Sequence, residues 1–142
     1  MMQVWTDIRL KEECVIKVLV VEDDVKHARL IKGILESYKC VVLEAGNGLS
    51  AMRIINDNTP DLIFVDMSLP GIDGTTLTKL FKTSTRTHHV PVIAISAMCT
   101  KQEIERFIQA GCDAIIHKPV HEQAIAEAIK KHIQKDEPDI LF

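Results

Sequence analysis

The chain has 142 residues, enough for one ordinary domain and too few for two sizeable ones. Its 46% hydrophobic and 26% charged residues are typical of a globular protein, and its net charge of −3 provides no basic field for nucleic-acid phosphates. The apolar runs are too short to cross a bilayer and the first residues lack a secretory pattern. We therefore expect a cytoplasmic protein that contacts neither membranes nor, directly, nucleic acid.

Five short apolar runs predict β-strands. They cover residues 18–21, 40–45, 62–65, 92–95 and 114–116. Three of the runs, at 18–21, 62–65 and 92–95, contain no polar residue, as expected of central parallel strands that helices cover on both faces. The other two runs are shorter or less uniform and suit flanking positions in a sheet.

Between and after the strands, apolar residues recur at helical spacing. The triplets that show it are Ala28, Ile31 and Leu35; Ile104, Phe107 and Ile108; and Ile125, Ile129 and Ile133. The alternation predicts an α/β fold: a three-layer sandwich around a doubly wound five-stranded parallel sheet, with the flavodoxin-like strand order 2-1-3-4-5. We expect an N-terminal extension at 1–15, a single domain at 16–135 and an acidic C-terminal tail at 136–142.

Reactive side chains stand where the central strands end. The first strand runs into Glu22 and Asp23, the third into Asp66, the fourth into Ser96, and the fifth leads to Lys118. In a doubly wound sheet, ligands bind beyond the carboxyl ends of the strands, near the point where the strand order reverses. We therefore expect these five side chains to share one cleft.

Three carboxylates in one cleft repel one another unless a cation neutralises them, so the pattern implies a divalent metal. Mg²⁺ prefers hard oxygen ligands and fits a small acidic set that also meets a phosphate. Asp66 is the natural nucleophile, with Lys118 as the opposing positive charge and Ser96 as a hydroxyl donor. Taken singly, Glu22 and Asp23 could serve only the start of a helix and Asp66 only the end of a strand, but their joint occurrence favours phosphoryl-transfer chemistry.

These residues lie in segments that resemble the receiver domains of two-component response regulators. The resemblance covers residues 17–135, close to the whole chain. Residues 18–24, VLVVEDD, resemble the opening strand and its acidic pair, and residues 67–74, MSLPGIDG, resemble the loop after the phosphoacceptor. Ser96 matches the switch Ser or Thr, with the small Ala97 after it leaving room for a phosphoryl group. Lys118 and Pro119 match a Lys-Pro pair whose peptide bond is typically cis.

The resemblance implies a function for the domain at 16–135. Asp66 would take a phosphoryl group from a histidine kinase or a histidine phosphotransfer protein, and the domain would catalyse only its own phosphorylation and dephosphorylation. Mg²⁺ would be held by Asp23, Asp66 and the Met67 carbonyl, with Glu22 acting through water. Ser96 would move toward the phosphate and change the binding of a downstream effector at a helix–strand–helix face, formed by residues 101–110, 114–116 and 121–134.

One position departs from the family pattern. Three residues before Lys118, where the family usually has an aromatic side chain that changes rotamer, this chain has Ile115. An aliphatic side chain cannot swing a ring between buried and exposed positions. We therefore expect Ser96 to be coupled to the binding face differently, or weakly.

Other interpretations stay open at this point. A pseudo-receiver that acts by docking without phosphate is favoured by Ile115, and a phosphatase with an aspartyl nucleophile would need a second acid where Ser68 stands. A flavodoxin-type carrier is disfavoured because no Gly-rich or Ser/Thr-rich phosphate loop follows the first strand. The chain resembles stand-alone single-domain regulators, although it could equally be a piece of a hybrid kinase or a larger regulator. The sequence leaves the oligomeric state undetermined.

Overall fold

The computed structural model describes residues 15–133 of the chain. The expected N-terminal extension, apart from Val15, and the expected C-terminal tail lie outside these residues. Among the described residues, no helix is both long enough and apolar enough to span a membrane.

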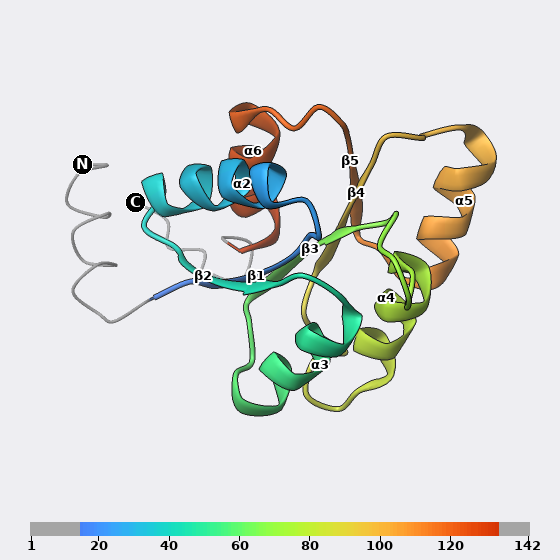
Figure 1. Ribbon diagram of the computed structural model, residues 1–142, viewed down its shortest axis with the longest axis horizontal. Coiled ribbons are helices and arrows are strands. Elements are labelled where there is room, and N and C mark those ends of the chain that lie inside the picture. The colour runs from blue at the N-terminus through green and yellow to red at the C-terminus, as the bar shows by residue number, and fades with distance from the viewer. Residues whose placement is uncertain (1–14, 134–142) are drawn as a thin grey trace, which may run out of the picture.

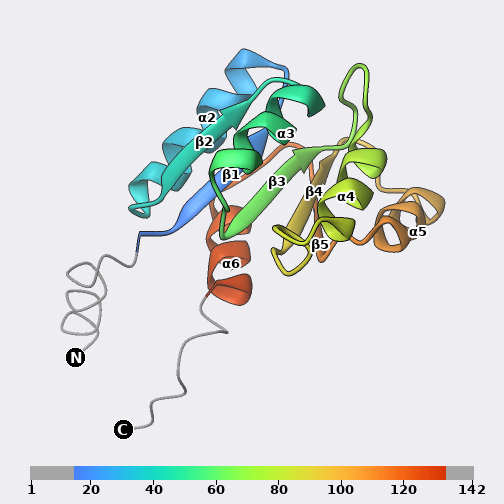
Figure 2. The ribbon, with the colours of Figure 1, turned by 90° about the horizontal axis from the view of Figure 1, so that it is seen from below.

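All five strands pair in parallel, in the order β2-β1-β3-β4-β5 (Figures 1 and 2). The predicted fold class and strand order are therefore confirmed. The strands are β1 (Lys17–Val21), β2 (Val41–Ala45), β3 (Leu62–Asp66), β4 (Val92–Ser96) and β5 (Ala114–His117). Three of them extend one residue further than predicted, because Asp66, Ser96 and His117 still take part in the sheet at its carboxyl edge.

Five helices connect and follow the strands: α2 (Val25–Ser37), α3 (Gly48–Asp57), α4 (Gly74–Thr83), α5 (Lys101–Ala110) and α6 (Glu122–His132). Side chains that accept hydrogen bonds from first-turn amides start four of these helices. The apolar triplets locate α2, α5 and α6 but not α3 and α4. In α5, Phe107 is buried as expected, whereas Ile108 is exposed.

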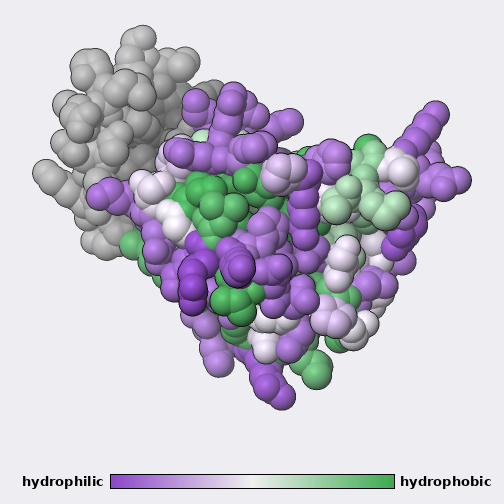
Figure 3. All heavy atoms as spheres, turned by 45° about the horizontal axis from the view of Figure 1, so that its top comes forward, coloured by the Kyte–Doolittle hydropathy of each residue, from purple (hydrophilic) through white to green (hydrophobic). Residues whose placement is uncertain are grey.

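The core has two halves, one on each face of the sheet. Alternate strand residues such as Val20 and Phe64 pack under α2 and α6, while their neighbours Val21 and Val65 pack against α3, α4 and α5. Figure 1 shows this division, with α2 and α6 on one side of the strands and α3 and α4 on the other. The surface over α2 and α6 is mostly polar, with apolar side chains gathered in small patches (Figure 3).

A polar contact ties the chain together at the amino end of β4. The Lys82 ammonium, on α4, donates to the carbonyl of Val90 at 2.9 Å and to the Asp113 carboxylate at 2.8 Å. The same Asp113 oxygen accepts the amide of Val92 at 2.8 Å. The end of α4, the start of β4 and the turn after α5 are thereby joined at the edge of the sheet opposite the reactive residues.

Candidate functional site

Three carboxylates meet at the carboxyl ends of β1 and β3. Glu22, Asp23 and Asp66 each place an oxygen so that the three atoms lie within 4.8 Å of one another. Glu22 and Asp66 are buried, whereas Asp23 is exposed. β1 and β3 are neighbours although β2 comes between them in the sequence, so the cluster lies where the strand order reverses. The predicted convergence of the acids is confirmed, and this donor set could hold a metal ion.

The Glu22 carboxylate is held by contacts from the start of α2. Asp24 caps that helix and donates its own amide to Glu22 Oε2 at 3.2 Å. The His27 ring lies one turn on, with Nδ1 at 2.7 Å from Glu22 Oε1. Burial raises the pKa of Glu22, as does the hydrogen bond with Asp66, while His27 and the Asp24 amide oppose that rise. A cation beside this carboxyl group would relieve the cost of its buried charge.

Asp66 is the last residue of β3 and is 3% exposed. Its Oδ1 accepts the amide of Ser68 at 3.0 Å and lies 3.5 Å from the Lys118 ammonium. The predicted opposition of Lys118 to the acids is thus present as an ion pair. Met67, directly after Asp66, is buried, and its amide bonds to the carbonyl of Ile95 on β4. Ser68 contributes its backbone amide here, and its side chain is not the second acid that a phosphatase would need at this position.

Ser96 is the last residue of β4 and is buried, but its hydroxyl is engaged within its own loop. The hydroxyl donates to the carbonyl of Met98 at 2.8 Å and accepts the Met98 amide at 3.0 Å. Ala97 between them is exposed. The structure therefore places Ser96 at the predicted edge of the sheet, with its hydroxyl bonded to the loop that leads into α5.

The end of β5 delivers Lys118 to the site. The Lys118 amide donates to the carbonyl of Ser96 at 2.9 Å, and the Lys118–Pro119 peptide bond is cis, as the resemblance implied. One residue earlier, the exposed His117 ring places Nε2 at 3.0 Å from the carbonyl of Ala97. Ile115, at the usual aromatic position, is half-buried against the side of the core that carries α3, α4 and α5.

Two residues that contact the site, His27 and His117, were not predicted from the sequence. A signal for His27 exists, because the third residue of a capped helix points back toward the residues before the cap. With Asp24 as the cap, that residue is His27, and Glu22, the acid that it contacts, stands two residues before the cap. His117 has a weaker signal: it directly precedes Lys118 at a strand end, and nothing in the pattern indicates which carbonyl it reaches.

The fold and site define a class of protein, and comparison with known proteins agrees. A family model of the response regulator receiver domain matches residues 18–130. The chain belongs to this family. It is similar to the polar-differentiation response regulator DivK of Brucella anthropi, with 34% identity over 116 residues, which cover 82% of this chain and 94% of DivK.

Solved structures give the same result. The receiver domain of the sensor histidine kinase PA1611 from Pseudomonas aeruginosa, which has a magnesium ion coordinated in its active-site cleft, aligns with a TM-score of 0.77 at 25% identity, covering 83% of this chain and 97% of that one. The signal receiver domain of a histidine kinase from Syntrophus aciditrophicus aligns with a TM-score of 0.79 at 27% identity, covering 89% of this chain and 97% of that one. Both relatives are receiver domains of kinases, whereas DivK is a response regulator.

Proposed function

We propose that this receiver domain is a phosphorylation switch in which Asp66 is the phosphoacceptor. The observation that carries the proposal is the placement of Asp66 between two other carboxylates and the Lys118 ammonium, 3.5 Å away, at one edge of the sheet. A lone acid at a strand end has no need of such a setting. A nucleophilic carboxylate beside a cation-binding cluster and a fixed positive charge is what phosphoryl transfer to an aspartate requires.

The donor we propose is the phosphohistidine of a histidine kinase or a histidine phosphotransfer protein. An Asp66 oxygen would attack the phosphorus, the P–N bond would break as the new P–O bond forms, and the departing imidazole nitrogen would take up a proton. Lys118 would balance the negative charge on the phosphoryl oxygens during this step, since its ammonium already faces the Asp66 carboxylate. The chain would act on no other substrate, catalysing only its own phosphorylation and dephosphorylation.

The donor set fits Mg²⁺. Carboxylate oxygens are the ligands that this ion prefers, and two of the three acids are buried where an uncompensated charge is costly. We propose that Asp23, Asp66 and the carbonyl of Met67 would hold the ion, with Glu22 acting through water. When bound, Mg²⁺ would neutralise the acidic cluster and polarise the phosphoryl oxygens.

The output we propose is a change in partner binding at the face formed by α5, β5 and α6. The loop that holds the Ser96 hydroxyl leads directly into α5, so a movement of Ser96 toward a phosphorylated Asp66 would reach this face first. An aspartyl phosphate carries a charge of about −2, in place of the single negative charge of the Asp66 carboxylate. The partner would be a downstream effector protein. We expect the exchange to take place in the cytoplasm, in line with the free thiols of Cys40, Cys99 and Cys112.

Incubation with acetyl phosphate and Mg²⁺, followed by intact-mass measurement, tests the proposal. The wild-type chain should gain about 80 Da, the mass of one phosphoryl group. The gain should vanish in Asp66→Ala and persist in Asp57→Ala, since Asp57 is an exposed aspartate at the end of α3. If the wild-type chain stays unmodified while a known receiver domain reacts in the same tube, the proposal is refuted. The chain would then be a pseudo-receiver that acts by docking alone.

A further inference from the structure

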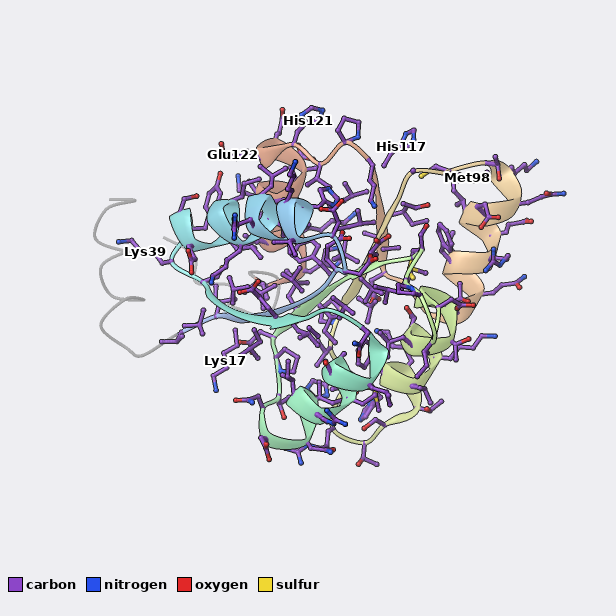
Figure 4. All side chains as sticks on the ribbon, in the orientation of Figure 1. Lys17, Lys39, Met98, His117, His121 and Glu122 are labelled. Carbon is purple, nitrogen blue, oxygen red and sulfur yellow. The ribbon has the colours of Figure 1, made fainter. Side chains whose placement is uncertain are left out.

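We propose that His117 is a positioning residue that clasps the loop after β4 in its resting conformation and so opposes the switch. The inference deepens the proposed function and rests on it, because it concerns the step that follows phosphorylation of Asp66. Its basis is the hydrogen bond between the His117 ring and the carbonyl of Ala97, at 3.0 Å, which we call the clasp. Figure 4 shows His117 at the end of β5, with its ring directed toward the loop that carries Met98.

The direction of this hydrogen bond follows from its partners. A backbone carbonyl can only accept, so His117 Nε2 must carry the proton and donate. This condition holds both for the neutral ring protonated at Nε2 and for the imidazolium. The contact therefore does not require a particular charge on the histidine.

The Ser96 hydroxyl shows why the clasp belongs to the resting conformation. A hydroxyl has one proton to donate, and in this structure Ser96 donates it to the carbonyl of Met98 at 2.8 Å. To donate instead to a phosphoryl group on Asp66, Ser96 must release Met98. The Met98 amide, which bonds to the same hydroxyl at 3.0 Å, loses its acceptor in that rearrangement. Ala97 lies between these two residues, so its peptide group must be free to move for the switch to occur.

His117 holds that peptide group from the neighbouring strand. Ser96 and His117 are paired in the sheet, and the Lys118 amide already fixes the carbonyl of Ser96 at 2.9 Å. The His117 bond extends this attachment by one residue, to Ala97. The clasp therefore places a restraint from β5 on the segment that has to move.

His117 lies on the same face of β5 as Ile115, which stands where the family usually has an aromatic residue. The two share a face because side chains two apart on a strand point the same way. That face is the side of the core where α5 packs. Although residue 115 is aliphatic, β5 still contacts the loop after β4 through His117. The structure thus offers a route from strand to loop that needs no ring to change rotamer.

Three variants test the clasp. His117→Ala removes the donor, His117→Gln retains a donor at a similar reach, and His88→Ala changes an exposed histidine before β4, at the opposite edge of the sheet. The affinity for beryllofluoride, a phosphoryl mimic, is measured with Mg²⁺ present. Loss of a hydrogen bond that holds the resting loop should tighten binding about three- to tenfold in His117→Ala. His117→Gln and His88→Ala should bind as the wild type does.

A second readout needs neither metal nor phosphate. Without ligands, amide exchange at Met98 should be about threefold faster in His117→Ala than in the wild type, because the loop would open more often. If beryllofluoride binds the wild type and His117→Ala equally well, the clasp is refuted while the proposed function stands. A wild type that does not bind beryllofluoride refutes the proposed function itself. If His117→Ala folds poorly, His117→Leu gives the same comparison, since leucine keeps bulk on the strand without a donor.

Discussion

Glu22 shows how much of this site depends on residues around the acids. Glu22 is 5% exposed, and its carboxylate is oriented by the His27 ring and the Asp24 amide. Groups that orient a metal-binding carboxylate set how well it binds, because the ligand need not be reorganised when the ion arrives. In the proposed site, His27 would therefore influence metal binding although it is not itself a ligand.

We predict that His27→Ala weakens Mg²⁺ binding about tenfold, because the buried Glu22 carboxylate loses its orienting donor. His27→Asn, whose amide can donate to the same oxygen, should lose less. Isothermal titration of Mg²⁺ measures both effects. Lys26→Ala, an exposed change on the same helical turn, is the control and should leave the affinity unchanged. Equal affinities in all variants would show that His27 has no part in metal binding.

At the residue scale, the positions of the acids and the opposing Lys118 could be predicted from the sequence, but the contacts of Ser96 and His117 could not. Asp66 and Ser96 follow wholly apolar runs, and parallel strands bring their carboxyl ends to one edge, so the convergence follows from topology. The orientation of the Ser96 hydroxyl and the reach of His117 depend on side-chain rotamers and loop geometry. Neither leaves a periodic trace in the sequence.

At the element scale, α4 shows why a helix can escape prediction. It begins with Gly74, Thr75 and Thr76, three residues of modest or low helix propensity, after the Asp73 cap. Asp73 accepts the Thr76 amide at 2.9 Å and the Thr75 hydroxyl at 2.7 Å, and these bonds lower its pKa. The helix is fixed by this cap and by its packing on β3. Tertiary contacts have therefore overridden the local signal.

Gly74 tests that packing. A Cβ at this position would lie 2.6 Å from the Met67 Cα and 3.0 Å from the Asp66 carbonyl, so backbone atoms would have to shift. We predict that Gly74→Ala lowers the free energy of unfolding by about 1–3 kcal/mol. Gly33→Ala, at an exposed position within α2 with no atom inside 4 Å, should instead raise it by about 0.5–1 kcal/mol. Urea unfolding followed by circular dichroism distinguishes the two signs, and a neutral Gly74→Ala would contradict the close approach.

At the scale of the whole molecule, the sheet joins two half-cores that neither layer of helices could form alone. Phe64 lies in the half under α2 and α6, and Phe81 lies in the half under α3, α4 and α5; both are fully buried. The alternation of helices and strands predicted this three-layer arrangement, since it needs only the order of elements and the handedness of their connections. Because every central strand contributes to both halves, we expect them to unfold together.

We predict that Phe64→Ala and Phe81→Ala each reduce stability by about 3–5 kcal/mol, through lost burial and the cavity left behind. Each variant should still unfold in a single transition, with the same midpoint by circular dichroism and by pulse proteolysis. Leu49→Ala, at a side chain that is 63% exposed, should change stability by less than about 0.5 kcal/mol. Separate transitions in either phenylalanine variant would mean that the two halves are independent.

The contact of Lys82 with Asp113 has a mechanical consequence for α5. Beyond its carboxyl end, the helix is anchored to α4 and β4 by this ion pair, and Gly111 lies against the Lys82 side chain. Its amino end follows a loop held by the Ser96 hydroxyl and the His117 ring. If that loop is displaced, α5 should rotate about its anchored carboxyl end. Spin labels at Gln102 and Gln109 should then travel unequally on beryllofluoride binding, and equal displacements would argue for a sliding helix.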